Sequence, residues 1–187
     1  MQAIGVISDT HGLLRPEALA ALQGSALILH AGDVGHLEIL DELSRIAPVH
    51  AVYGNTDFGD LRRHLPRTRV VDLASEDGSP AGEAGGDGDG RPRGADAGSR
   101  SAAPSGTLAY VHHGDRELDL DPAAAGIILV VSGHTHRPLV EWRGEVLFLN
   151  PGSAGPRRFN LPATVARVKV LDDGSLEAEI VPLDPEA

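Results

Sequence analysis

The sequence repeats one local pattern, in which a short apolar run ends abruptly in a loop rich in aspartate, histidine, asparagine and glycine. Between these runs, residues 16–22 and 37–46 have the apolar spacing of amphipathic helices. Strands that alternate with helices predict an α/β fold, in which the polar loops after the strands share one edge of a sheet. The first three runs cover residues 3–8, 26–30 and 49–53, and the loops after them contain Asp9, Asp33 and Asn55.

The second half of the chain alternates apolar and polar residues, which is typical of antiparallel strands joined by turns. The run at 127–132 is the most hydrophobic, and residues 119–125 before it predict a short helical turn. Residues 75–106 are rich in Gly, Ala and Pro and contain little to bury, so we expect a flexible insertion at a hairpin tip within a single domain, 1–187. Further strands are predicted at 69–73, 108–112, 139–142, 146–150, 164–170 and 176–181.

Composition narrows the kinds of function that the chain could have. It contains no cysteine, so a metal site would use His, Asp, Glu or Asn, which suit manganese, iron, zinc, nickel or magnesium. The formal net charge is −11 and no basic stripe is interleaved with aromatics, so we expect no non-specific nucleic-acid binding. No apolar run has the length of a signal peptide or membrane span, so we expect a cytoplasmic protein without membrane contact.

Side chains of the types that bind metals cluster at the ends of five predicted strands. Two pairs are separated by a single residue, and in an extended turn both members of such a pair could reach one metal. Two divalent ions about 4 Å apart would acidify a bridging water and hold a phosphate. Each motif alone is more often an ordinary polar turn, so the case depends on all of them together. The candidate metal ligands are Asp9, His11, Asp33, Asn55, His113, His134 and His136.

The choice among neighbouring histidines is less direct. His112 competes with His113, because strand alternation places the two on opposite faces. We favour His113, which directly precedes Gly114. His30 and His36 lie near the predicted Asp33 loop and could orient ligands, although a packed or surface role is favoured for both.

In this order the motifs resemble those of the calcineurin-like metallophosphoesterases, and most closely the small bacterial and archaeal phosphodiesterase branch. The resemblance covers nearly the whole chain outside 75–106, and every ligand position of the family pattern is filled. The motifs that carry it are Asp9-Thr10-His11, Gly32-Asp33, Gly54-Asn55, His113-Gly114, Gly133-His134-Thr135-His136-Arg137-Pro138 and Asn150-Pro151-Gly152-Ser153.

The resemblance implies a four-layer α/β/β/α sandwich with two mixed β-sheets. It also implies a binuclear centre of two divalent ions, with manganese favoured, that cleaves a small phosphate ester and most often a diester. A metal-bridging hydroxide would attack phosphorus in line with the leaving oxygen, while Asn55 stabilises the phosphoryl oxygens. One ion would be held by Asp9, His11, Asp33 and His136, and the other by Asp33, Asn55, His113 and His134.

The chain departs from the family pattern after Asn55, where many members have a histidine that assists the leaving group and this sequence has Thr56. A proton donor contributes ~10²–10⁴-fold, so its absence favours good leaving groups. Arg157 is a candidate for contact with a substrate phosphate, with a solvated surface role as the alternative. Two other functions stay open: a protein-binding scaffold on the same fold, as in a retromer-type subunit, and a nuclease. A homo-oligomer is also left open.

Overall fold

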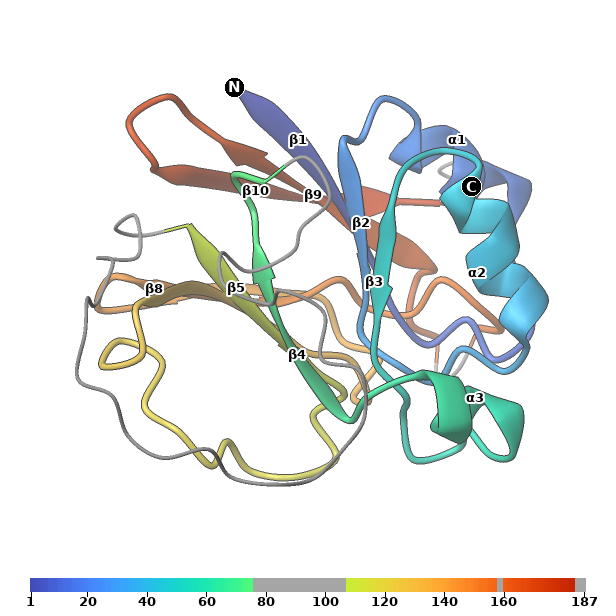
Figure 1. Cartoon of the computed structure of the whole chain (residues 1–187). Helices are drawn as coiled ribbons and strands as arrows, with labels where there is room; N and C mark the ends of the chain where they lie inside the picture. Colours follow the sequence, from blue (N-terminus) through green and yellow to red (C-terminus); the bar gives the residue numbers. More distant parts are fainter. Residues whose placement is uncertain (76–106, 158–159, 184–187) are drawn as a thin grey trace.

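The computed structural model describes residues 1–75, 107–157 and 160–183, and within them two five-stranded mixed β-sheets pack face to face (Figure 1). The two mixed sheets implied by the resemblance are therefore confirmed. The first sheet contains β10 (Leu176–Pro182), β9 (Thr164–Val170), β1 (Gln2–Ile7), β2 (Leu27–His30) and β3 (Val49–Ala51), in that order. The second contains β4 (Thr68–Asp72), β5 (Leu108–His112), β6 (Ile127–Val131), β8 (Val146–Asn150) and β7 (Leu139–Arg143).

Each sheet contains three neighbouring parallel strands. In the first sheet β1, β2 and β3 run parallel, with Ile4 opposite Leu27, and in the second β5, β6 and β8 do so. The antiparallel strands β9 and β10 extend the first sheet, while β4 and β7 form the two edges of the second. The carboxyl ends of parallel strands share one edge of a sheet, so the predicted polar loops after these strands are brought together.

The main hydrophobic core lies between the two sheets, because alternate residues of each strand point inward. It is built from aliphatic side chains, as the scarcity of aromatic residues requires. A fully buried leucine or isoleucine contributes roughly 1.5–3 kcal/mol relative to an exposed one, so this interface dominates the stability of the fold. Among its fully buried members are Ile4, Val6, Leu27, Leu29, Val111, Leu129 and Leu147.

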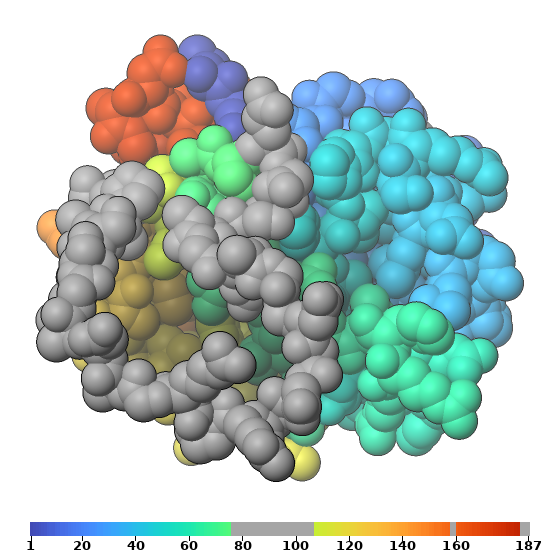
Figure 2. Space-filling model, in the orientation of Figure 1, coloured from blue at the N-terminus to red at the C-terminus, as the bar shows by residue number. Residues whose placement is uncertain are grey.

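Three helices cover the outer face of the first sheet: α1 (Pro16–Leu22), α2 (Leu37–Ser44) and α3 (Asp60–His64). They occupy one flank of the molecule in Figure 2. Helix α1 has the predicted bounds, whereas α2 ends two residues earlier than the expected range 37–46. Helix α3 was not predicted, because it has only five residues, of which Leu61 alone is buried.

The outer face of the second sheet differs from the expected four-layer arrangement, since no helix covers it within the described residues. The loop after β5 packs on it instead, with Leu118 and Leu120 against Tyr110 and Val130. The helical turn expected at 119–125 is a turn centred on 122–126, in which the amide of Ala125 donates to the carbonyl oxygen of Asp121 at 3.1 Å. The layer on this side is therefore a loop.

Strands β4 and β5 form an antiparallel pair whose ends face each other, with Asp72 opposite Leu108. The amide of Leu73 donates to the carbonyl oxygen of Thr107 at 2.9 Å and extends this pairing. The predicted hairpin is thus confirmed, while the insertion at 75–106, which we expect to be flexible, lies outside the described residues except for Ser75. In the described part of the chain, no helix is long and apolar enough to cross a membrane.

Candidate metal centre

The seven predicted ligand side chains converge where the carboxyl ends of the parallel strands meet. Five of them form two overlapping groups, and within each group one donor atom per residue lies within 4.8 Å of the others. The overlap means that neighbouring positions could hold two cations with shared ligands. The groups are Asp9, His11 and His136, and Asp9, Asp33 and His113, while Asn55 and His134 contact the second group from its more exposed side.

The first group centres on Asp9. Its Oδ1 atom lies 3.2 Å from Nε2 of His136 and 3.9 Å from Nε2 of His11, and the two histidine Nε2 atoms are 3.3 Å apart. Oδ1 is buried and lacks a hydrogen-bond partner in the described structure. A buried carboxylate oxygen without a partner is costly, and a cation among these three donors would satisfy it. The donor set therefore fits a divalent metal.

The second group brings Asp33 and His113 together. The Oδ2 atom of Asp33 is 3.3 Å from Nε2 of His113 and 3.9 Å from Nε2 of His11, so this carboxylate faces both groups. The amide oxygen of Asn55 lies 2.9 Å from Nε2 of His113 and 3.1 Å from Nδ1 of His134. Asp9 is the residue that the two groups share, while Asp33 lies near donors of both, so its role as the bridging ligand stays a prediction.

The backbone of the site is unusual, because five of the seven side chains sit on residues with positive φ. L-residues other than glycine seldom adopt this left-handed conformation, and such strain clusters at functional sites. Our premise that paired ligands converge through an extended turn is therefore wrong for these loops, although the paired side chains do meet. The residues and their φ values are Asp9 (54°), His11 (46°), Asp33 (53°), His134 (67°) and His136 (58°).

Local hydrogen bonds fix the orientation of Asp9. Its Oδ2 atom accepts from the Ser8 hydroxyl at 2.6 Å and from the backbone amide of His134 at 3.0 Å, which leaves Oδ1 facing the donors. Gly133 makes this approach feasible, because a Cβ there would collide with Oγ of Ser8 and lie 2.7 Å from Oδ2 of Asp9. The glycine beside His134 therefore has a steric role in the site.

Asp57 is a functional candidate that we did not single out from the sequence. It is almost completely buried, and its carboxylate accepts from the amides of Gly54 at 2.9 Å, Gly35 at 2.9 Å and Val34 at 3.1 Å. These bonds tie the loop after β2 to the loop after β3. The available signal was an aspartate two residues beyond the Gly54-Asn55 motif.

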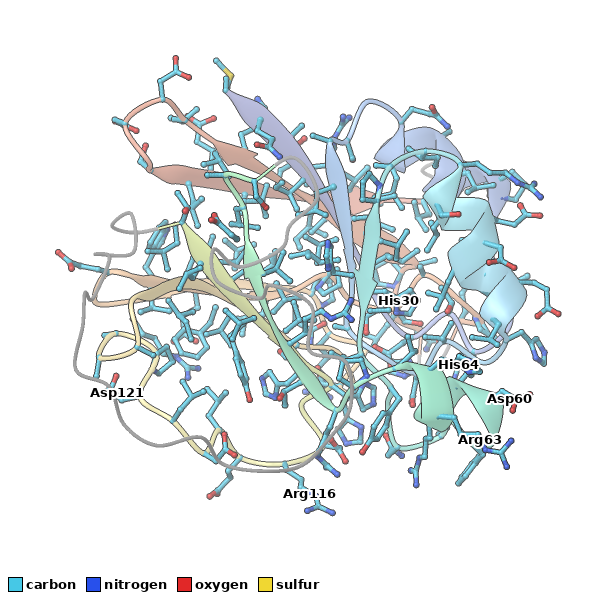
Figure 3. The ribbon with its side chains drawn as sticks, viewed as in Figure 1. His30, Asp60, Arg63, His64, Arg116 and Asp121 are labelled. Atoms are coloured by element: carbon cyan, nitrogen blue, oxygen red, sulfur yellow. The ribbon has the colours of Figure 1, made fainter. Side chains whose placement is uncertain are left out.

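His30 links two ligand loops from inside the protein (Figure 3). Its ring is fully buried, with Nε2 3.0 Å from the Thr10 hydroxyl, and its Nδ1 accepts from the amide of Gly32 at 3.3 Å. Because the Thr10 hydroxyl donates to the carbonyl oxygen of Val34, it accepts from His30, and the ring is neutral with its proton on Nε2. Burial lowers the pKa of His30 from 6.5 to about 4, despite nearby carboxylates that oppose this effect.

Three other sequence candidates lie in different surroundings. The His112 ring lies 5.7 Å from that of Tyr110, centroid to centroid, whereas Nε2 of His113 lies 3.3 Å from Oδ2 of Asp33. The structure therefore brings His113, and not His112, into the cluster. His36 is exposed at the start of α2. Arg157 is exposed in the loop that follows β8, and its substrate-binding role stays a prediction.

In the second group, Asp33 and His113 shift each other's pKa in opposite directions. Burial alone would raise the pKa of Asp33, but hydrogen bonds with His113 and with the backbone amide of Thr56 hold it well below its usual range. Burial would also lower the pKa of His113, whereas Asp33 and the carbonyl oxygen of Ala31 raise it above its ordinary value. Ionised Asp33 and protonated His113 therefore stabilise each other.

Comparison with known proteins places this arrangement in a family. A model of the calcineurin-like phosphoesterase superfamily domain matches residues 2–173. A probable metallophosphoesterase of Methanothermobacter thermautotrophicus is 34% identical over 188 residues, which cover 95% of this chain and 91% of that protein.

Solved structures share the fold. An archaeal phosphodiesterase superimposes with a TM-score of 0.64 at 20% identity, covering 96% of this chain and 99% of its own. Wild-type Vps29 of Entamoeba histolytica, complexed with Zn²⁺, gives a TM-score of 0.60 at 20% identity, covering 97% and 99%. These two likenesses show the fold alone. The matched family model and the 34% identical relative show that the chain belongs to the calcineurin-like phosphoesterase superfamily.

Proposed function

We propose that the protein is a two-metal phosphodiesterase that cleaves small phosphate diesters. The observation that carries this proposal is the buried Oδ1 atom of Asp9, which has no hydrogen-bond partner in the described structure and faces two histidine donors. An oxygen and nitrogen donor set of this kind suits manganese, with iron, zinc, nickel or magnesium as alternatives. The shared fold of an archaeal phosphodiesterase supports the proposal.

Each metal position has its own ligands in this proposal, and Asp33 serves both. When bound, the metals supply Lewis acidity to the phosphoryl oxygens and lower the pKa of a water that attacks phosphorus. The first position would use Asp9, His11, Asp33 and His136, and the second Asp33, Asn55, His113 and His134.

The chain's own residues orient the substrate and the ligands. With its amide oxygen turned toward His113 and His134, Asn55 can direct its NH₂ group toward a phosphoryl oxygen and stabilise developing charge. The Thr56 hydroxyl lies 3.4 Å from Nδ1 of His11, where it can orient that ring. A threonine hydroxyl is a poor acid at neutral pH, so we expect a preference for substrates with good leaving groups.

The test is hydrolysis of bis(p-nitrophenyl) phosphate by protein stripped of metal and then supplied with Mn²⁺, Zn²⁺, Ni²⁺ or Mg²⁺. Asp33→Asn keeps the size of the side chain but removes the charge that would bridge the metals. We expect metal-dependent turnover that this variant loses. Its metal affinity should fall by more than ~100-fold, the upper end for partners outside the ligand shell. Metal-independent turnover, or full activity in Asp33→Asn, would contradict the proposal.

One observation favours a second function, a protein-binding scaffold. Every residue of the edge strand β7 is exposed, including Leu139 (43%), Val140 (42%) and Trp142 (52%). An exposed apolar group on an unpaired edge is a feature of interaction sites. The two functions are separated by the same assay, because a scaffold with a structural metal would bind the ions tightly yet show no turnover with any of them.

A further inference from the structure

A cleft of about 360 Å³ lies on the outer face of the second sheet, beside the candidate metal centre. Ala109 and Val111 point into the core between the sheets, so the intervening Tyr110 and the following His112 point outward from β5. Thr68 of β4 is paired with His112 and lines the same cleft. The loop after β5 forms the opposite wall, and the volume is within the range of small-molecule sites.

The cleft borders the metal centre at His113, whose side chain is buried toward the cluster. This residue lines the cleft, while its Nε2 atom lies 3.3 Å from Oδ2 of Asp33. A diester whose phosphate sits over the cluster would therefore have one ester group at the entrance of the cleft. No residue of the cleft other than His113 belongs to the proposed metal ligands.

The chemistry of the walls indicates which group would fit. Tyr110 and His112 line the cleft with rings whose centroids lie 5.7 Å apart, and the His112 ring is the more accessible, because Tyr110 is only 5% exposed. Rings beside polar groups bind planar polar molecules by stacking and hydrogen bonding.

The charged side chains that line the cleft disfavour binding of a second anionic group there. Arg67 is paired with Asp115 at 3.1 Å. Arg116 projects outward from the loop (Figure 3), and Glu117 and Asp119 add two carboxylates to the wall. Carboxylates therefore outnumber guanidinium groups in the lining, and a phosphorylated ester group would be repelled.

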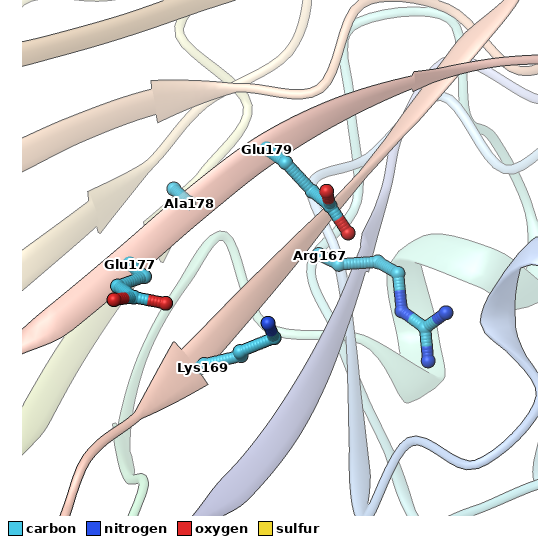
Figure 4. A pocket seen from close by; sticks show the side chains of 5 residues that line it. All are labelled: Arg167, Lys169, Glu177, Ala178 and Glu179. Atoms are coloured by element: carbon cyan, nitrogen blue, oxygen red, sulfur yellow. The ribbon is translucent and has the colours of Figure 1, made fainter.

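A second cleft in the described structure offers no comparable site. It holds about 130 Å³ on the β9–β10 hairpin, where Lys169 lies opposite Glu177 and Arg167 opposite Glu179 in the strand register (Figure 4). Opposite charges across the strands offset each other there, and the hairpin provides no ring.

We propose that the cleft lined by Tyr110, His112 and Thr68 binds the second ester group of the substrate, and that this group is an uncharged, ring-bearing polar alcohol of the nucleoside type. The inference rests on the proposed phosphodiesterase function and names its substrate class. The substrate is thus a diester with a nucleoside-like group on one side and a good leaving group on the other.

Two chromogenic diesters with the same leaving group test this assignment. Thymidine 5′-(p-nitrophenyl phosphate) carries a nucleoside, whereas methyl p-nitrophenyl phosphate carries only a methyl group, so the ratio of their kcat/KM values reports binding in the cleft. We expect the wild-type protein to favour the thymidine ester. The ratio should fall on the order of tenfold in Thr68→Trp, which fills the cleft, and in His112→Ala, which removes a ring. Glu179→Ala on the distant hairpin should keep the wild-type ratio.

A binding experiment tests whether the cleft binds a nucleoside even if the protein turns out not to be a phosphodiesterase. Thymidine is titrated into the metal-free protein and backbone amide shifts are followed by NMR. Saturable shifts at 108–119 that disappear in Thr68→Trp, with the variant folded by circular dichroism, support the assignment even if neither ester is hydrolysed. Absence of such shifts, or a kcat/KM ratio unchanged in both cleft variants, would overturn it.

Discussion

The Oδ2 atom of Asp33 lies 3.3 Å from Nε2 of His113, while Nδ1 of the same ring donates to the carbonyl oxygen of Ala31 at 2.8 Å. The backbone contact fixes the ring so that Nε2 faces the carboxylate. When His113 is neutral this arrangement presents a lone pair to a cation, and when it is protonated it forms an ion pair with Asp33. Proton and metal therefore compete for one nitrogen.

Metal binding should release a proton from His113. Because the pKa of His113 is raised, the ring is still partly protonated near pH 7 in the metal-free protein, and metal affinity should increase as the pH rises through that raised value. Calorimetric titration with Mn²⁺ in buffers of different ionisation enthalpy measures the protons released. His113→Asn should release fewer protons per protein at pH 7 than the wild type, and equal release by both proteins would contradict the expectation.

Asp57→Asn should destabilise the protein, because the amide can no longer accept three backbone N–H groups as the carboxylate does. Losing bonds to a charged group predicts a decrease of about 3 kcal/mol in the free energy of unfolding, measured by urea denaturation. Metal affinity should fall by about 10–100-fold, since Asp57 holds together two ligand loops. Asp60→Asn at the exposed start of α3 is the matched control and should change neither quantity appreciably. If Asp57→Asn has the stability of the wild type, the three bonds make no net contribution to the free energy of unfolding.

His30 should make the stability of the metal-free protein depend on pH. Its pKa is about 4 in the folded protein, against 6.5 for an unperturbed histidine, so the unfolded chain binds more protons between these values and stability falls as the pH decreases from 6.5 to 4. The shift corresponds to about 3 kcal/mol. His30→Asn should remove that part of the pH dependence in urea denaturation performed with a chelator. The same substitution at exposed His64 should leave it in place, and a His30 variant with the full wild-type slope would refute the assignment.

Gly54→Ala should impair metal binding through Asp33. A Cβ at residue 54 would collide with Oδ1 of Asp33 and lie 2.7 Å from its Cγ, so the carboxylate has to move. Overpacking of this kind typically costs about 1–3 kcal/mol, and calorimetry should show weaker binding of Mn²⁺. Gly24→Ala is a suitable control, because its φ is +77° but no atom lies within 4 Å of the added Cβ. Gly24→Ala should lower the stability of the protein without changing its metal affinity. Equal metal affinity in the two variants would therefore exclude a collision with Asp33 as the cause of weaker binding.

Much of the fold could be predicted from local patterns, because the spacing of apolar residues in each segment was typical of either a helix or a strand. The run at 127–132 became β6 and residues 16–22 became α1, with bounds that differ by at most one residue. The order β4-β5-β6-β8-β7 could not be derived from periodicity, since neighbours in a sheet are chosen by packing between segments distant in sequence.

The identities of the clustered residues were also predictable, whereas the way in which they are held was not. Asp9 and His134 were recognised by residue type and order, but the bond from the His134 amide to Oδ2 of Asp9 joins positions 125 residues apart. Asp57 gave too weak a signal, because one aspartate in a turn is more often solvated than buried. Three backbone bonds to it become visible only when two loops are placed side by side.

The left-handed backbone at five of the clustered residues has a consequence for how such a protein can change over generations. A residue held in a sparsely populated conformation costs of order 1–3 kcal/mol, and glycine at the same position costs far less. Replacing His134 by glycine would therefore relax the loop while it removes a donor. A lineage no longer selected for catalysis would gain thermodynamic stability by losing this histidine. The most stable proteins that descend from this one would then be those that have lost the ligand cluster and kept the rest of their surface.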